Sequence, residues 1–165
     1  MIDTTGSENP NFASLLSRAA SLYTGRTAIA HRSSRTSFSA LGRRAAGIAA
    51  ALTNMGIGDA DRVAVLARSP EDSAAGFFAA LGVGATGINV NELYKPRQIE
   101  FVLAHSRAKV LLVGSDVLKS MPRDIETAAR VVVMEEIQAS SEEFAPKITE
   151  ADAPAQITYT SGSTG

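Results

Sequence analysis

The sequence predicts an α/β fold in which helices flank a mostly parallel sheet. From residue 62 onward, apolar strand-like runs alternate with segments of helical periodicity, which is the pattern of consecutive βαβ units. The first run, RVAVLAR, is almost continuously apolar, as expected of a strand that is covered on both faces. The chain has 165 residues, of which 45% are apolar and 20% charged, so it can bury one core of ordinary domain size. We therefore expect one domain or one piece of a larger domain.

Two short elements are predicted before this alternation begins. Residues 12–23 predict a short helix with Asn11 as its N-cap, because apolar side chains recur on one of its faces. That face consists of Phe12, Leu15, Leu16 and Ala19. The runs TAIAH (27–31) and TSF (36–38) flank the polar stretch RSSR and predict a small hairpin.

The clearest helix is expected to begin with Ser39 as its N-cap and to close at Gly56. Its apolar residues keep a 3.6-residue rhythm and comprise Leu41, Ala45, Ile48, Ala49, Leu52 and Met55.

Strands and helices then follow one another to the end of the sequence. Ser69 is the expected N-cap and Pro70 the first residue of a helix that runs to residue 81. The other expected elements are strands at 62–68, 86–90, 109–113, 130–134 and 157–160 and a helix at 96–105. Residues 135–155 are acidic and contain Pro146 and Pro154, so they predict an irregular connection.

Composition and charge exclude several classes of function. The 16 basic and 17 acidic side chains include no cationic run that would follow a phosphate backbone, so we expect no nucleic-acid partner. There is no Cys, and His31 and His105 lie far apart without ligand spacing, so we expect no metal site made by the chain itself. No apolar stretch approaches the roughly 20 residues of a membrane span, and the first residues lack a signal-peptide pattern. We expect a cytoplasmic protein without a transmembrane segment.

The histidines and the paired acids are expected to have no catalytic role. Neither histidine has a serine or an acid at a spacing that suggests a triad, and His105 near a helix end suits the negative end of the helix dipole. The pairs Glu135–Glu136 and Glu142–Glu143 are expected to form a solvated face.

Two glycine patterns are interpreted as turns. GVGATG (82–87) matches G-x-G-x-x-G, but it leaves a predicted helix and enters a strand, whereas a dinucleotide-binding loop leaves a strand and opens a helix. GIGDAD (56–61) is likewise expected to end a helix ahead of a strand.

A third pattern, TSGSTG (160–165), follows the apolar run ITYT and differs in this respect. A turn of Gly, Ser and Thr can present several backbone N–H groups and hydroxyls to the oxygens of a polyphosphate. It contains neither a Walker A sequence nor the nucleophile elbow G-x-S-x-G. Composition alone favours a flexible polar tail at least as much as an anion site.

The stretch ITYTSGSTG resembles the phosphate-binding motif of the adenylate-forming enzymes, which include acyl-CoA synthetases, luciferases and peptide-synthetase adenylation domains. An ordered series of upstream segments, including GDADRVAVL and SPE, is similar to the N-terminal part of that family over most of residues 12–165. NVNELYKPRQIEFVL resembles fatty acyl-CoA synthetases in particular, although Glu92 replaces a common Pro and Lys95 a common Thr.

This resemblance implies an enzyme that activates a carboxylic acid, here a fatty acid, as acyl-AMP and transfers it to coenzyme A. ATP and Mg²⁺ would be required, and the expected ligands of the ATP phosphates are Thr160, Ser161, Gly162, Ser163, Thr164 and Gly165. These groups would stabilise charge on the phosphate oxygens without forming a covalent bond. No catalytic residue is expected within this segment.

In the family the motif continues with a proline, a lysine and a glycine, so residues 1–165 are expected to be the N-terminal portion of a longer AMP-binding domain. By itself this portion is expected to be inactive. Two alternatives stay open. One is a segment of another adenylate-forming enzyme, with an amino or aryl acid as substrate and a carrier protein as acceptor, and the other is a non-catalytic α/β module.

Overall fold

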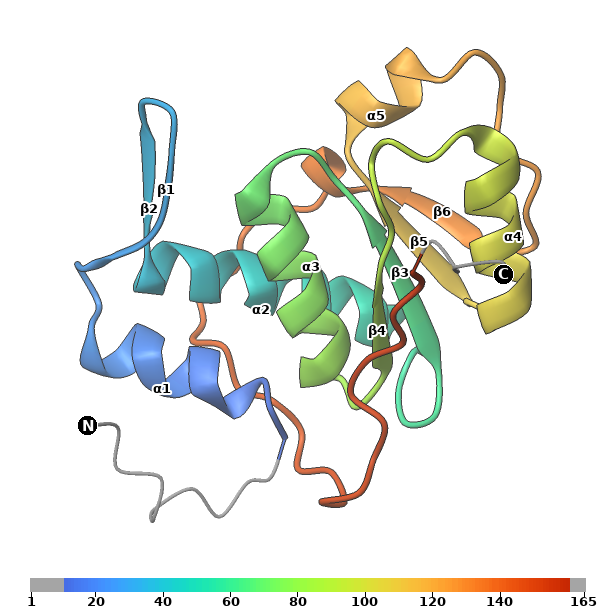
Figure 1. The fold of residues 1–165 in the computed structure, drawn as a ribbon. Helices are drawn as coiled ribbons and strands as arrows, with labels where there is room; N and C mark the ends of the chain where they lie inside the picture. Colours follow the sequence, from blue (N-terminus) through green and yellow to red (C-terminus); the bar gives the residue numbers. More distant parts are fainter. Residues whose placement is uncertain (1–10, 161–165) are drawn as a thin grey trace.

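β3 (Arg62–Leu66) and β5 (Val110–Val113) form the centre of a parallel sheet, and nearly all of their side chains are buried. β4 (Thr86–Asn89) pairs with the outer side of β3, and β6 (Arg130–Val133) pairs with the outer side of β5. The resulting order is β4-β3-β5-β6 (Figure 1). The computed structural model describes residues 11–160. Within them, this four-stranded sheet with its flanking helices confirms the predicted α/β fold class.

Helices cover both faces of the sheet. The alternation of side chains along β3 divides the core, because Val63 and Val65 belong to one cluster of buried residues and Ala64 and Leu66 to the other. The first cluster packs against α1 (Ser14–Leu22), α2 (Phe38–Asn54) and α3 (Pro70–Gly82). The second packs against α4 (Pro96–Ser106) and α5 (Ser115–Ser120). Both central strands are therefore covered on both faces, which the sequence of β3 predicts.

The predicted hairpin is present as β1 (Thr27–His31) paired antiparallel with β2 (Ser34–Ser37). It projects from the body of the protein beside α2 (Figure 1). The turn is shorter than RSSR, because Ser34 and Arg35 already pair with His31 and Ala30.

Two of the four predicted helix starts are confirmed, since α3 begins at Pro70 and α4 at Pro96, and the other two are wrong. Ser69 caps α3 as expected, since its hydroxyl accepts the Asp72 N–H at 3.2 Å. The prediction that Ser39 caps α2 is wrong: Ser37 takes that position, with extended backbone angles and its hydroxyl accepting the Ala40 N–H. The prediction that Asn11 caps the first helix is also wrong, because the helix begins at Ser14 after Ala13.

Asn11 instead ties the start of the described chain to two distant segments. Its Oδ1 accepts the Ala13 N–H, and its Nδ2 donates to the carbonyl oxygens of Leu81 at 2.7 Å and Lys147 at 2.9 Å. The side chain is buried, so these bonds satisfy groups that water cannot reach.

Both glycine patterns interpreted as turns are helix ends followed by strands. α3 closes with a Schellman arrangement in which Gly84, at φ +85°, donates to Leu81 and Ala85 donates to Ala80. α2 ends in the same way around Gly56, at φ +77°. GVGATG therefore has the geometry of a helix stop, as expected, and not that of a dinucleotide-binding loop.

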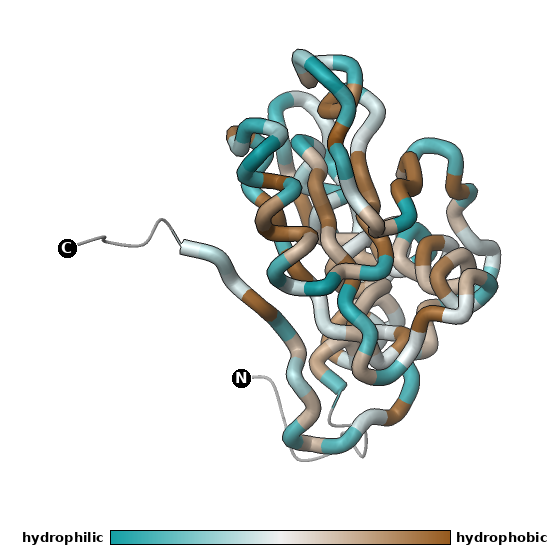
Figure 2. Tube along the Cα trace, turned by 90° about the vertical axis from the view of Figure 1, so that its right-hand side faces the viewer, coloured by the Kyte–Doolittle hydropathy of each residue, from teal (hydrophilic) through white to brown (hydrophobic). Residues whose placement is uncertain are grey.

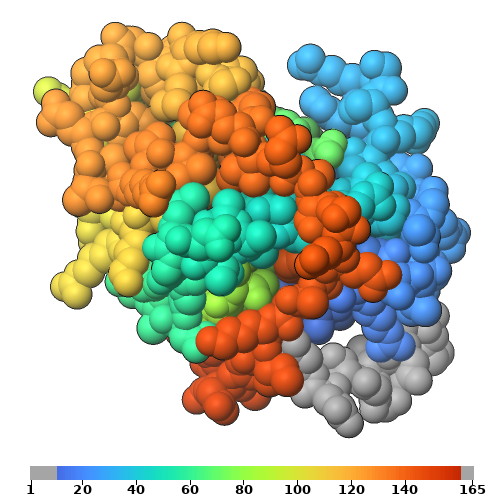
Figure 3. Space-filling view, turned by 180° about the vertical axis from the view of Figure 1, so that it is seen from behind, coloured from blue at the N-terminus to red at the C-terminus, as the bar shows by residue number. Residues whose placement is uncertain are grey.

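The connection after β6 contains one 3-10 turn, Met134–Glu136, and otherwise no helix or strand through residue 155. It crosses the molecule over part of α2 (Figure 3). The Ser140 N–H donates to the Arg43 carbonyl, and the Lys147 N–H donates to the Gly82 carbonyl. Phe144, only 4% exposed, enters the core between these two attachments.

The prediction of a strand at 157–160 is wrong, because the backbone of these residues does not pair as a strand. The chain pairs with the free edge of β4 at a single parallel bridge, Gly87 with Gln156, and residues 157–160 are outside any strand. Ile157 and Tyr159 still point inward and pack on the α4 side of the core. The segment therefore keeps the alternating burial of a strand while it runs along one side of the molecule without a ladder partner (Figure 2).

Candidate functional site

The predicted phosphate loop begins at the last residue that the structure describes. Thr160 is exposed. The other predicted ligands lie outside the described residues: Ser161, Gly162, Ser163, Thr164 and Gly165. The structure defines the segment that leads into the loop, residues 155–160, and the elements to which this segment is bonded.

The first attachment of this segment is at β4. The Gly87 N–H donates to the Ala155 carbonyl at 3.0 Å, and the Ile157 N–H donates to the Gly87 carbonyl at 3.1 Å. The Thr86 hydroxyl donates to the Pro154 carbonyl at 3.0 Å. The segment thus runs parallel to β4 at its free edge. Gly87 suits this place because a Cβ there would lie 2.6 Å from the Phe77 ring of α3.

The second attachment is at α4. The Tyr159 hydroxyl forms a 2.8 Å hydrogen bond with Nδ1 of His105, and the two rings meet edge to face. Ile157 and Tyr159 lie against the core, whereas Thr158 and Thr160 are exposed. This contact has no signal in the sequence, since 54 residues separate His105 from Tyr159 and no spacing rule connects them.

The segment NVNELYKP forms the turn between β4 and α4. Asn91 Oδ1 accepts the Leu93 N–H at 2.9 Å, and the Gln98 side chain accepts the Lys95 N–H at 2.9 Å. Pro96 is the first residue of α4. These bonds organise a surface loop and a helix start, and they leave Leu93 81% exposed.

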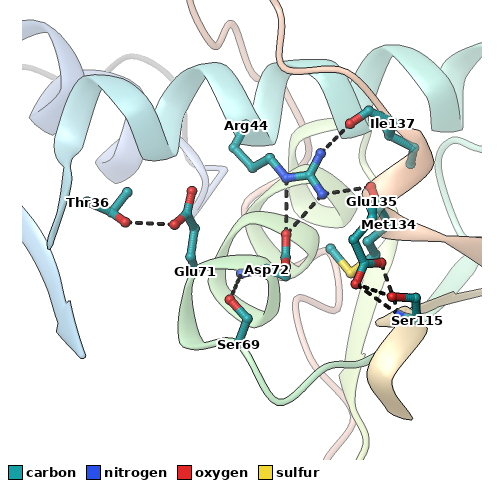
Figure 4. Close-up of polar contacts among 9 residues, drawn as sticks. All are labelled: Thr36, Arg44, Ser69, Glu71, Asp72, Ser115, Met134, Glu135 and Ile137. Carbon is teal, nitrogen blue, oxygen red and sulfur yellow. Dashed lines mark hydrogen bonds and ion pairs between the residues drawn. The ribbon is translucent and has the colours of Figure 1, made fainter. Parts of the chain in front are cut away.

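An arginine that the sequence did not single out joins three elements near the end of β6. Arg44 of α2 donates to Asp72 of α3 through Nε and Nη2, at 3.1 and 2.9 Å (Figure 4). It also donates to the carbonyl oxygens of Met134 and Ile137. The side chain of Arg44 is 13% exposed, so this network is largely shielded from water. Its role is to hold the connection after β6 against the helices.

The acidic pairs differ in their surroundings. Glu142 and Glu143 are exposed, as expected of a solvated face. Glu135 is exposed as well, yet its carboxylate accepts both the N–H and the hydroxyl of Ser115 (Figure 4). Partial burial opposes ionisation of Glu135, but the hydrogen bonds from Ser115 prevail and lower its pKa. This carboxylate joins the 3-10 turn after β6 to the start of α5.

Two further properties of the described residues bear on function. Residues 11–160 contain no group of three or more His, Asp or Glu side chains placed to hold a metal ion. None of the helices in this range is both long and apolar enough to cross a bilayer.

Comparisons with known proteins identify the family. Residues 16–165 match the family described as AMP-binding enzyme. A long-chain-fatty-acid–CoA ligase from Thermus thermophilus is 30% identical over 96% of this chain and 32% of that protein. Tyrocidine synthase 1 from Brevibacillus parabrevis is 27% identical over 92% of this chain and 14% of that protein. The chain therefore spans about a third or less of the length of these two relatives.

A solved structure supports the fold. The inhibitor-bound N-terminal domain of FACL13 from Mycobacterium tuberculosis superposes with a TM-score of 0.77, over 96% of this chain and 42% of that one, at 24% identity. Together with the family match, it confirms the resemblance to adenylate-forming enzymes that the sequence motifs predict. The chain belongs to the AMP-binding enzyme family.

Proposed function

We propose that this chain is the N-terminal portion of an ATP-dependent acid–thiol ligase, and that residues 160–165 bind the phosphates of ATP. The observation that carries the proposal is the placement of ITYT. Two side chains of this segment pack on the core and its backbone is bonded to β4, so the Gly-, Ser- and Thr-rich sequence follows a fixed segment. The family match, which extends through residue 165, supports the same role.

The proposed reaction has two steps. A carboxylate oxygen of the acid attacks the α-phosphorus of ATP, the bond to the β-phosphate breaks, and pyrophosphate leaves with the displaced electron pair. The acid becomes a mixed anhydride with AMP. Coenzyme A gives up its thiol proton to solvent and its sulfur then attacks the acyl carbon. The bond from that carbon to the phosphate oxygen breaks, and AMP leaves with the electron pair as the thioester forms. Activation is needed because a free carboxylate is a poor electrophile at neutral pH.

The proposed contribution of residues 160–165 is electrostatic. Hydroxyls of Thr160, Ser161, Ser163 and Thr164 and the N–H groups of Gly162 and Gly165 are hydrogen-bond donors that suit phosphate oxygens. Mg²⁺ would neutralise phosphate charge when it enters with ATP. The donor set of hydroxyl and amide groups fits a phosphate, and this proposal assigns no metal ligand to the chain.

We further propose a fatty acid as the substrate and coenzyme A as the acceptor. The support is the segment NVNELYKP together with the 30% identity to the Thermus ligase. The similarity to tyrocidine synthase 1 favours a second candidate, in which an amino acid is activated and a carrier protein accepts it. The cytoplasmic location expected from the sequence stays a prediction.

The experiment that separates these candidates uses the full-length protein encoded by the reading frame. It is incubated with ATP, Mg²⁺ and, in turn, fatty acids of several lengths, aryl acids and amino acids, with and without coenzyme A. Mass spectrometry of the products is expected to find fatty acyl-CoA. Adenylation of amino acids without any acyl-CoA would contradict the coenzyme A assignment and support the second candidate. The 165-residue chain alone is expected to release no acid-dependent AMP.

A further inference from the structure

Three rings from two distant parts of the chain meet on the outer side of α4. Phe101 and His105 are one helical turn apart and stack, with centroids 5.5 Å apart and an interplanar angle of 23°. Tyr159 meets both of these rings edge-on, at 84° to each. Offset-stacked and edge-to-face pairs of this kind are the favoured arrangements of aromatic rings. We call Phe101, His105 and Tyr159 the three-ring cluster.

A directed bond fixes the orientation of the cluster. The Tyr159 hydroxyl lies 2.8 Å from Nδ1 of His105. A phenol hydroxyl both donates and accepts, so this bond forms with either neutral tautomer of the imidazole. The ring contacts hold Tyr159 near α4, and the hydrogen bond selects one position of its hydroxyl. Phe101, at 61% exposure, and His105 lie at the surface, whereas Tyr159 packs in part against the core.

The cluster lies at the point where the backbone of the terminal segment loses its support. Between described residues, the last backbone hydrogen bond of this segment is that from Ile157 to Gly87. Residues 158–160 have no strand partner in the described chain, and the side chain of Tyr159 makes the contacts that follow. Tyr159 immediately precedes Thr160, the first residue of TSGSTG.

We infer that His105 is a positioning residue for ATP: through Tyr159 it fixes the start of the loop that would hold the phosphates. The inference rests on the proposed function of residues 160–165. Because the side chain of Tyr159 is held in place, fewer backbone conformations are open to the residue that follows it, Thr160. Less conformational freedom then remains to be lost when ATP binds, so binding and reaction both benefit. His105 acts only through Tyr159 and has no assigned contact with the phosphates.

The test is a double-mutant cycle in the full-length protein, with acid-dependent exchange of pyrophosphate into ATP as the measurement. His105→Ala and Tyr159→Phe are each expected to lower kcat/KM for ATP by about 5- to 10-fold, the loss of one hydrogen bond. The kcat/KM of the double variant is expected to be no lower than that of the less active single variant, because both changes remove the same hydrogen bond. The KM for the acid is expected to change less than the KM for ATP.

Matched controls come from the same chain. His31→Ala, on the hairpin, and Tyr23→Phe, beside α1, are expected to leave exchange unchanged. His105→Asn retains a polar group about as far from the backbone as Nδ1 and is expected to restore most of the loss in His105→Ala. A purely structural role would instead lower the melting temperature and change the kinetics for ATP and acid alike. Additive effects of the two single changes, or no rescue by His105→Asn, would overturn the inference.

A second measurement separates this inference from the proposed function. Hydrogen–deuterium exchange at residues 157–159 is expected to become faster in His105→Ala and Tyr159→Phe but not in the two controls. If the wild-type protein shows no pyrophosphate exchange with any acid, the proposed function and the role of His105 in ATP binding both fail. Hydrogen–deuterium exchange at residues 157–159 then still decides whether the contact between His105 and Tyr159 holds these residues in place. Unchanged hydrogen–deuterium exchange in both variants would show that His105 does not hold residues 157–159 in place.

Discussion

Gly47, in the middle of α2, lies directly under the backbone carbonyl of Gln138. A Cβ on residue 47 would overlap that carbonyl oxygen and would lie 3.1 Å from the Ser140 nitrogen. The connection cannot easily move away, because Ser140 is bonded to Arg43 and the carbonyl of Ile137 is bonded to Arg44. The absence of a side chain at residue 47 is what allows the connection after β6 to cross α2.

This contact predicts the sign of a helix substitution. Gly→Ala within a helix ordinarily stabilises a protein by about 1 kcal/mol. Gly47→Ala is instead expected to lower the free energy of unfolding by about 1–3 kcal/mol, because the clash is with backbone atoms of Gln138 and Ser140 and not with a flexible side chain. Urea denaturation measures the difference. Thr53→Ala, an exposed position of α2, is the control and should be neutral or slightly stabilising; stabilisation by Gly47→Ala would contradict the packing described here.

Arg44 is expected to be irreplaceable by lysine. Its guanidinium donates hydrogen bonds to Asp72 and to two carbonyl oxygens at once, and the single ammonium group of lysine cannot reproduce this planar arrangement of donors. Arg44→Lys should therefore lower stability by about 1–3 kcal/mol, since at least one partly buried acceptor loses its donor. Arg43→Lys, at the exposed neighbouring position, should change stability by less than about 0.5 kcal/mol. Equal melting temperatures for the two variants would refute the importance of the network.

Asp61 is expected to make stability depend on acid pH. Burial opposes its ionisation, but the bonds from Lys109 and the Gly58 N–H prevail and hold the pKa of this carboxyl below its usual value. The ionised carboxylate of Asp61 therefore contributes fully to the free energy of unfolding above its unfolded-state pKa, about 3.9. This contribution is lost as the pH falls through the lower folded-state pKa.

Asp61→Asn should consequently cost about 1–2 kcal/mol at pH 7, and the difference from the wild type should shrink below about pH 4. Thermal unfolding at a series of pH values tests this. Asp152→Asn, at an exposed position, is the control and should shift no midpoint appreciably. A difference between wild type and Asp61→Asn that stays constant from pH 7 to pH 3 would argue against the assigned interactions.

Thr164→Ala in the full-length protein is expected to lower the rate of adenylate formation by about 10²- to 10³-fold, as loss of one transition-state donor typically does. Stability should be unchanged, because residue 164 follows the packed segment. Pyrophosphate exchange and the melting temperature are measured together. Thr158→Ala, an exposed hydroxyl two residues before Thr160, is the matched control and should retain its exchange rate. Full exchange activity in Thr164→Ala would remove that hydroxyl from the phosphate site.

The sequence predicted correctly those helix ends that depend on residues adjacent in the chain. The Ser69–Pro70 pair fixes the start of α3 because cap and first residue are adjacent in sequence, and Gly84 ends it because the turn requires a positive φ. Ser39 was predicted as the N-cap of α2, but Ser37 has an equally suitable hydroxyl and takes the position, since β2 ends at Ser37 and the helix follows at once. α5 was missed because its six residues bury only Val117, too short a pattern for helical periodicity.

Contacts between distant residues had no such signal. The apolar run ITYT predicted a strand, but strand pairing depends on the free edge of β4, where the described residues form a single bridge, Gly87 with Gln156. The same holds for Arg44 with Met134 and for His105 with Tyr159, since each pair is separated by more than 50 residues. The candidate loop was identified from its composition and its family resemblance, and the segment that holds it only from the structure.

The most direct test of the account is exchange of labelled pyrophosphate into ATP by the full-length protein. This reaction reports acyl-adenylate formation alone and needs neither coenzyme A nor a carrier protein. We expect exchange that requires Mg²⁺ and a carboxylic acid, is highest with a fatty acid, and falls in Thr164→Ala but not in Thr158→Ala. Absence of exchange with every fatty, aryl and amino acid, in a protein shown to be folded, would contradict the central claim.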